Sequence, residues 1–171
     1  MLRTERLLLT PLRVGDAREM VGVLADPELY VFTGGQPPTL EDLTTLYRSQ
    51  VAGPGQGDEL WHNWILRSVV TNTAVGFVQA TVVGDSADLA WVVGGDWQGQ
   101  GFAKEGAAAL KGWLASSGTE HFAAHVHPEH VASQRVAAAI GLRRSGEIDE
   151  DDEEIWTGHP DPHQGERPLV V

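Results

Sequence analysis

The sequence predicts an α/β fold in one domain, with strands and helices mixed along the chain. First, an apolar, β-prone run at residues 89–93 leads through a glycine-rich turn into an alanine-rich helical pattern that begins near residue 102. Second, the β-prone runs 61–70 and 75–83 flank a short turn, which is typical of an antiparallel hairpin. Third, 171 residues without cysteine are enough to build one core that needs no disulfide.

The composition excludes several classes of function. Hydrophobic residues make up 42% and charged residues 21% of the chain, as in an ordinary globular protein. A formal net charge of −12 argues against nucleic-acid binding, which needs clustered lysine and arginine. The first residues are too polar for a signal peptide and no apolar run approaches a membrane span, so we expect a cytoplasmic location and no membrane contact. An acidic surface favours cationic partners, among them protonated amines.

The N-terminal elements follow from local signals. Residues 5–12 form an apolar run that contains a late proline, which predicts a first strand. Asp16 is placed to cap a helix over 17–24. Thr39 and Asp42 have the spacing of a capping box, which predicts that another helix begins there.

The segment after the central helix is predicted as a strand and a short helix. Apolar and polar residues alternate over 121–127, which indicates a strand. The helical run 132–140 ends at Gly141, a residue suited to the left-handed position that follows a helix. The chain therefore returns to the sheet before its last elements.

The C-terminal elements are predicted as a hairpin and a tail. Residues 147–154 hold seven acids in eight positions, which indicates a solvated hairpin tip, and a short closing strand follows at 155–157. Residues 159–171 are rich in proline, glycine and aspartate and are expected to be an irregular tail. No composition shift divides the chain, so 1–171 is expected to be a single domain.

The glycine-rich turn at residues 98–103 is predicted to bind an anion. It lies at a helix start, where backbone N–H groups have no intrahelical partner and the helix macrodipole adds partial positive charge. Gly99 and Gly101 let the backbone approach a ligand closely, and Ala103 keeps the next turn uncluttered. Phosphate groups are the natural ligands of such a site, although the spacing matches neither a dinucleotide fingerprint nor a Walker A loop.

The motif Gln98-x-x-Gly101-x-Ala103 resembles the Gln/Arg-x-x-Gly-x-Gly/Ala signature of the GNAT N-acetyltransferases, in which this loop holds the pyrophosphate of acetyl-CoA. The opening residues 4–7, with Pro11-Leu12-Arg13 and Asp16-Ala17, are similar to the opening of the RimJ/RimL-type branch of that family. This branch acetylates protein N-terminal and other amines. The two matches are independent of one another.

The resemblance extends over residues 4–156 and implies a fold and a donor site. The implied GNAT fold is a mixed, mostly antiparallel sheet with a V-shaped splay and helices on both faces. Residues 128–142 look like the family's Asn-x-x-Ser segment, with His130 where asparagine is usual. The residues that the resemblance assigns to acetyl-CoA are Trp91, Val92, Val93, Gln98, Gly99, Gln100, Gly101, Phe102, Ala103, His130 and Ser133.

Acetyl transfer to an amine needs a positioned donor, a deprotonated amine and a proton for the leaving thiolate, but no protein nucleophile and no metal. Many family members place an acidic residue at the position of Asp88, which makes Asp88 the first candidate for the base; His62 and Glu59 are alternatives. Ser133 falls where the branch places a serine near the cofactor sulfur, so it is expected to hydrogen-bond or protonate the thiolate. A backbone N–H of residues 90–93 is expected to polarise the thioester carbonyl.

The implied acceptor is a small-molecule or peptide amine, and the aromatic loop 30–38 is expected to wall its site. Family members are often dimers, so the resemblance leaves a homodimer open. No stretch of this sequence marks an interface. A catalytically silent acyl-CoA-binding domain also stays open. Many family members use a tyrosine as the acid, and this chain has none after Tyr47.

A metal-dependent hydrolase is a further alternative. The pattern His125-x-His127-x-Glu129-His130 has the spacing of the metallo-β-lactamase ligand motif, and His159-x-Asp161-x-His163 would add ligands. Against this, the pattern carries glutamate for aspartate and lies late in a short chain. It also overlaps the segment that the acetyltransferase resemblance already explains.

Overall fold

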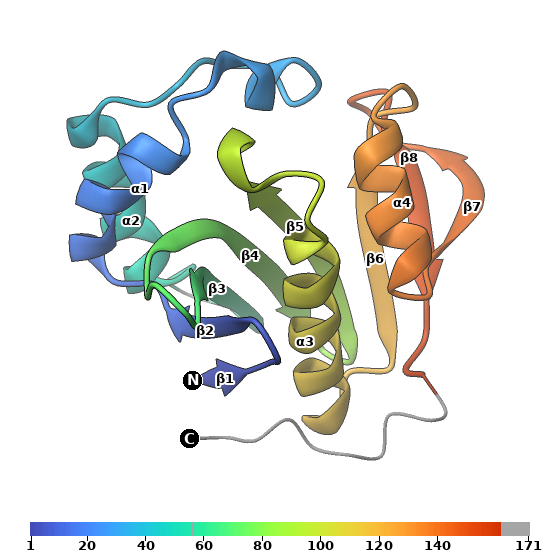
Figure 1. Ribbon diagram of the computed structural model, residues 1–171. Coiled ribbons are helices and arrows are strands. Elements are labelled where there is room, and N and C mark those ends of the chain that lie inside the picture. The colour runs from blue at the N-terminus through green and yellow to red at the C-terminus, as the bar shows by residue number, and fades with distance from the viewer. Residues whose placement is uncertain (56, 162–171) are drawn as a thin grey trace.

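Within residues 1–55 and 57–161, which the computed structural model describes, an eight-stranded sheet has the order β1-β2-β3-β4-β5-β6-β8-β7 (Figure 1). Neighbouring strands pair antiparallel, except that β5 and β6 pair parallel. The strands are β1 (Leu2–Arg3), β2 (Leu7–Pro11), β3 (Glu59–Ser68), β4 (Ala74–Val83), β5 (Ser86–Val93), β6 (His121–Val126), β7 (Arg143–Ile148) and β8 (Glu154–Gly158).

Helices cover both faces of this sheet (Figure 1). On one face, Met20 and Leu43 bury their side chains against Ile65 of the sheet. On the other face, Leu110 packs with Leu66 and Val78 in the larger core. The helices are η1 (Val14–Asp16), α1 (Ala17–Val23), η2 (Pro27–Tyr30), α2 (Leu40–Ala52), η3 (Gly95–Trp97), α3 (Phe102–Ser116) and α4 (Val131–Ala139), of which α1 and α2 cover the first face and α3 and α4 the second.

One glycine lets α3 lie close to the sheet. Gly106 is buried, and a Cβ atom at this position would come within 2.7 Å of Cδ2 of Leu66. Any larger residue would therefore push the first turns of α3 away from β3. The start of α3 is held in place by its packing, which fixes the turn that precedes it.

The sheet opens between β5 and β6. Register pairs join Ser86–Asp88 to His121–Ala123, and beyond them β5 runs on to Val93 and β6 to Val126 without pairing with each other. The edge of β5 that faces β6 is thus unpaired over its last residues. This is the V-shaped splay that the family resemblance implies, and the predicted α/β architecture is confirmed.

Most local predictions are confirmed, with one correction at the first helix. Thr39 and Asp42 form the predicted capping box of α2. Asp16 occupies the N-cap position of α1, but its side chain does not cap the helix. It accepts a hydrogen bond from the backbone N–H of Arg13 and pairs with Arg67 at 2.8 Å, because a charged, partly buried arginine is a stronger partner than a helical amide.

The ends of the chain bring two further observations. The short strand β1 pairs with β2 through Leu2 and Leu9 and was not predicted, since two residues carry no periodicity. The predicted tail is described only as far as Asp161, and residues 162–171 lie outside the described residues.

Candidate active site

The glycine-rich turn joins β5 to α3 through η3. Gly99 has φ +72° and Gly101 has φ +81°, a left-handed conformation that favours glycine. Gly101 is also the N-cap residue of α3 and has no side chain to satisfy the first helical N–H groups. Among the described residues, none accepts a hydrogen bond from the backbone N–H of Gly99, Gln100 or Gly101. These donors fit an anionic group such as a pyrophosphate.

Two side chains stabilise this turn, one that belongs to the turn and one from the N-terminal segment. Gln98 donates from Nε2 to the backbone oxygen of Val93 at 3.2 Å, which ties the turn to the end of β5. Arg6 donates from Nη1 to the backbone oxygen of Gln100 at 2.8 Å and lies over the ring of Phe102. The turn is therefore held in shape before any ligand arrives.

Glu105, in the first turn of α3, anchors the N-terminal segment to the same place. Its carboxylate accepts hydrogen bonds from Thr4 Oγ1 at 2.6 Å, from the Arg6 backbone N–H at 2.9 Å and from Arg6 Nε at 2.7 Å. Burial alone would raise the pKa of Glu105, but these hydrogen bonds and the Arg6 charge hold that pKa below its usual value. A negative charge here also suits the positive end of the helix dipole.

A cavity of about 1210 Å³ extends from the glycine-rich turn through the splay. Residues from the turn, β5, α4 and the loop 28–38 line it. Every residue that the sequence assigns to the donor site lines this cavity except Gln100, whose side chain donates to the backbone oxygen of Asp96. The structure thus brings together two stretches of chain that are about thirty residues apart.

The loop 30–38 crosses toward the start of α4. The ring of Phe32 stacks on His130 with centroids 4.5 Å apart and also contacts His127 at 5.2 Å. Burial, with a smaller effect from His127, lowers the pKa of His130 and so favours its neutral form. Ser133, one turn further on, lines the cavity from α4.

A second, smaller cavity of about 530 Å³ lies on the face of the sheet that carries α2. Asp88, His125 and Glu153 line it together with the amides of Asn63 and Gln79. No lysine or arginine of the described chain lines it. The two cavities share several lining residues, His125 and Glu153 among them, so these side chains stand where the cavities meet.

His125 is held between two carboxylates. Its Nδ1 lies 2.5 Å from Oδ2 of Asp149, and its Nε2 lies 3.9 Å from Oδ1 of Asp88. Oδ1 of Asp149 accepts hydrogen bonds from the backbone N–H groups of Asp151 and Glu153, each at 2.9 Å. These backbone N–H groups, and then His125, hold the pKa of Asp149 below its usual value. Burial and the neighbouring Asp149 charge raise the pKa of Glu153.

This arrangement corrects the interpretation of the acidic run 147–154. Most of its residues are exposed, as predicted for a hairpin tip, but Glu153 lines both cavities and Asp149 pairs with His125. Sequence reasoning placed His125 only in a metal pattern and missed both acids. One signal was present, because Asp149 precedes a strand by a few residues and aspartate commonly closes such a turn through its side chain.

The two alternative bases are not placed to act. His62 packs edge-on against Trp113 of α3 with centroids 5.0 Å apart, on the face opposite the smaller cavity. Burial lowers its pKa. Glu59 binds Trp61 Nε1 and lines neither cavity. Of the three predicted candidates for the base, Asp88 is therefore the one that lines the smaller cavity.

The histidine pattern of the metal alternative does not gather in the described part of the chain. His125 groups with Asp149 and Glu153, whereas His127 binds the backbone N–H of Glu129 through Nδ1. Of the further ligands predicted, Asp161 pairs with Lys111, and residue 163 lies outside the described residues. The pattern therefore does not form one site among the residues described.

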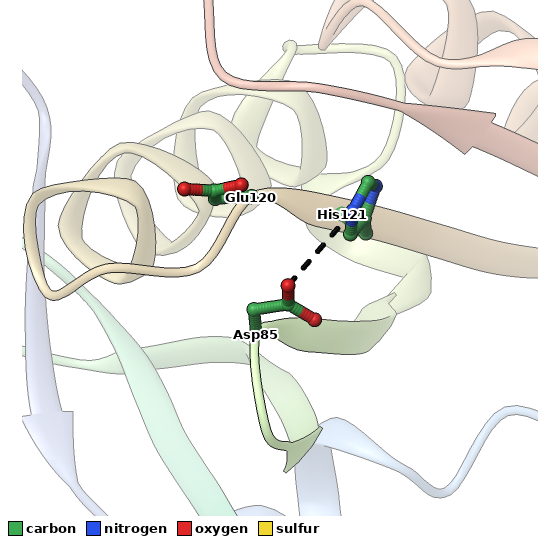
Figure 2. A group of neighbouring side chains, drawn as sticks. All are labelled: Asp85, Glu120 and His121. Atoms are coloured by element: carbon green, nitrogen blue, oxygen red, sulfur yellow. Dashed lines mark ion pairs between the residues drawn. The ribbon is translucent and has the colours of Figure 1, made fainter.

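A second acidic group with a histidine lies at the other end of β6. Asp85, Glu120 and His121 are neighbours there, and all three are exposed (Figure 2). Nε2 of His121 is 4.0 Å from Oδ2 of Asp85, with more than half of each side chain exposed to solvent. This group belongs to neither cavity.

None of the helices in the described part of the chain has the length and apolar character needed to cross a bilayer.

Comparisons with known proteins agree with this geometry. A family model described as an acetyltransferase (GNAT) domain matches residues 6–143. An acetyltransferase of the GNAT family from Bacillus anthracis is similar in structure, with 21% identity, a TM-score of 0.75, and coverage of 92% of this chain and 97% of that chain. No curated protein sequence matches significantly.

Two further solved structures are similar. A proposed ribosomal-protein-serine acetyltransferase from Vibrio cholerae shares 18% identity, with a TM-score of 0.76 and coverage of 93% of this chain and 97% of that chain. An aminoglycoside acetyltransferase solved with coenzyme A shares 16% identity, with a TM-score of 0.74 and coverage of 90% and 94%. At these identities the likeness establishes the fold.

Proposed function

The chain belongs to the GNAT acetyltransferase family, whose members use acetyl-CoA as the donor, and on this basis we propose that it acetylates a cationic primary amine of a small molecule or a peptide. The transfer is direct, in a ternary complex with both substrates. One observation carries the proposal: backbone N–H groups at the start of α3, which have no partner among the residues that the structure describes, open onto a cavity that meets a second, acidic cavity at His125 and Glu153.

The donor side follows from the backbone. The glycine-rich turn supplies N–H groups and the positive end of the α3 dipole to the pyrophosphate of acetyl-CoA. The unpaired edge of β5 supplies an N–H that polarises the thioester carbonyl. When bound, acetyl-CoA supplies an activated acetyl group. The protein's own contribution on this side is to fix position, which can lower the barrier by several kcal/mol.

The acceptor side follows from charge. Asp88 and Glu153 line the smaller cavity, and no basic residue of the described chain offsets them there. A protonated amine is drawn to such a site, and Asp88 takes part in removing its proton. Ser133, on the far side of the splay in the larger cavity, hydrogen-bonds or protonates the leaving thiolate.

We further place the enzyme in the RimJ/RimL-type branch. Thr4 and Arg6, which carry that resemblance, both bind Glu105 beside the glycine-rich turn, so the motif has a structural task at the donor site. The fold likeness to the Vibrio cholerae protein agrees with this placement. A cytoplasmic location, a single domain over 1–171 and a homodimer are parts of the same proposal.

The test is release of free thiol from acetyl-CoA with a panel of amines. The panel holds peptides with free N-termini, a polyamine, an aminoglycoside and amino acids, and each amine is paired with its pre-acetylated form as control. Turnover with a free amine and none with its control, together with a mass increase on that amine, is expected. Binding of acetyl-CoA without turnover on any amine would favour a silent binding domain.

A further inference from the structure

His125 lies on the part of β6 that has left β5. The last register pair between the two strands joins Asp88 to Ala123, two residues before His125. Phe122, Ala124 and Val126 point into the core on the α3 side, so alternation places His125 on the opposite face. There it lines both cavities. Its position is the passage between the proposed donor site and the acidic cavity.

The contact with Asp149 fixes which ring nitrogen carries the proton. The pKa of Asp149 lies below its usual value, so this carboxyl is ionised near neutral pH and can only accept hydrogen bonds. Nδ1 of His125, 2.5 Å away, must then be the donor. In the neutral imidazole, Nε2 is left with a free lone pair.

The charges that face His125 come from several elements. Asp88 from β5 lies 3.9 Å from Nε2, a separation at which one amine nitrogen can contact both atoms. Asp149 and Glu153 come from the turn between β7 and β8, and His127 follows at the end of β6. The side chains facing His125 are thus three carboxylates and one imidazole, so an imidazolium formed there lies among mainly negative groups.

We propose that His125 accepts the proton of the acceptor amine and that Asp149 is its positioning residue; this rests on the proposed function. The ammonium group loses one proton to Nε2 of His125, which becomes an imidazolium between Asp149 and Asp88. The freed amine lone pair then forms a C–N bond to the acetyl carbon, and the C–S bond breaks. The second N–H proton goes to the thiolate, which leaves as coenzyme A thiol, and the imidazolium returns its proton to solvent.

The chain contains a matched control on the same strand. His121 lies four residues before His125, on the same face of β6, and also neighbours an aspartate, Asp85 (Figure 2). It is 54% exposed, at 4.0 Å from its carboxylate, and it lines neither cavity. His125 is 37% exposed, and Asp149 is 17% exposed. Replacing either histidine removes a similar side chain, but only one faces the proposed reaction.

The experiment compares His125→Ala, Asp149→Asn and His121→Ala with the wild type, using an amine found active in the thiol-release assay. Asparagine keeps Oδ1 for the turn but presents an NH₂ group to Nδ1, which moves the imidazole proton to Nε2. Each variant is measured for kcat against pH, for acetyl-CoA affinity by calorimetry and for thermal unfolding. His125→Gln serves as a second variant in case the alanine does not fold.

The expected results separate proton transfer from structure. His125→Ala loses about 100-fold or more in kcat near neutral pH, and Asp149→Asn about 10-fold or more, with acetyl-CoA affinity within about twofold of wild type. The kcat of the wild type rises with pH to a plateau, whereas the kcat of His125→Ala continues to rise at pH values above the start of that plateau. Added imidazole restores part of the His125→Ala rate. His121→Ala keeps the wild-type rate and profile.

Two results would overturn the inference in different ways. In the first, the wild type turns over and the kcat of His125→Ala stays within about threefold of the wild-type value, or its pH profile is unchanged. This result would exclude His125 from proton transfer and leave the proposed function intact. A wild type that neither binds acetyl-CoA nor acetylates any amine would overturn the proposed function, and this inference with it.

Discussion

The proposed donor side, in the larger cavity, and the proposed acceptor side, in the smaller cavity, are formed by different kinds of chemical group. The proposed donor side is mainly one stretch, from β5 through the glycine-rich turn into α3, with His130 and Ser133 added from the α4 segment, and its proposed pyrophosphate ligands are backbone N–H groups. The acceptor side is assembled from α2, β3, β4, β5, β6 and the turn before β8, and its chemistry lies in side chains. Substitutions in the two regions should therefore affect acetyl-CoA binding and amine turnover separately.

The largest expected effect is on the donor side. In Gly101→Glu, a negative side chain projects from the turn at a position with φ +81°, so it both strains the turn and repels the pyrophosphate. We expect acetyl-CoA affinity to fall by about 100-fold or more, measured by calorimetry.

A control at another left-handed glycine isolates the electrostatic part. Gly118→Glu has similar strain, at φ +103°, in open space and outside both cavities. It should keep wild-type affinity. An equal loss of acetyl-CoA affinity in the two variants would mean that backbone strain alone weakens binding. The glycine-rich turn would then have no special part in binding.

A smaller effect is expected from the acidic lining. Asp88→Asn and Glu153→Gln each remove a charge from the smaller cavity, so the KM for a cationic amine should rise about 5-fold while acetyl-CoA affinity stays unchanged. The wild-type KM should also rise with salt, and the rise should be weaker in the double variant. Unchanged KM values in both variants would contradict an electrostatic acceptor site.

The smallest effect is on stability, at the anchor beside the donor side. Glu105→Ala loses the hydrogen bonds from Thr4 and Arg6, which should lower the free energy of unfolding by about 1–2 kcal/mol at pH 7. The pKa of Glu105 in the fold lies below its usual value of 4.5. The stabilisation is therefore present above about pH 4.5 and is lost as the pH falls through the folded-state pKa.

Urea unfolding of wild type and Glu105→Ala at several pH values between 7 and 3 measures this. The gap between the two proteins should narrow as the solution becomes acidic. A gap that does not change with pH would show that packing, rather than the ionised carboxylate, anchors the N-terminal segment.

The same comparison explains how much could be predicted from the sequence. The strand, the turn and the helix start of the donor side are signalled within a few residues, so Gly99 and Gly101 could be assigned directly. Asp149 lies 24 residues from His125, inside a run of acids. The local turn signal at Asp149 does not tell that this acid meets His125, since the tertiary pairing of β6, β8 and β7 decides that contact.

The alternation of residues along β3 also bears on His62. His62, Trp64 and Leu66 alternate along β3, so they share a face. Because Trp64 and Leu66 are apolar and favour the core, the same alternation places His62 on the core face, away from the acceptor side. The structure shows it against Trp113 on that core face.

The most direct test of the central claim is calorimetric titration of acetyl-CoA into His125→Ala beside Gly101→Glu. If donor binding resides in the backbone turn and amine chemistry in the side chains, His125→Ala should bind within about twofold of wild type. Under the same conditions Gly101→Glu should show no measurable binding. Loss of binding in both variants, or in neither, would contradict the separation of the two sides.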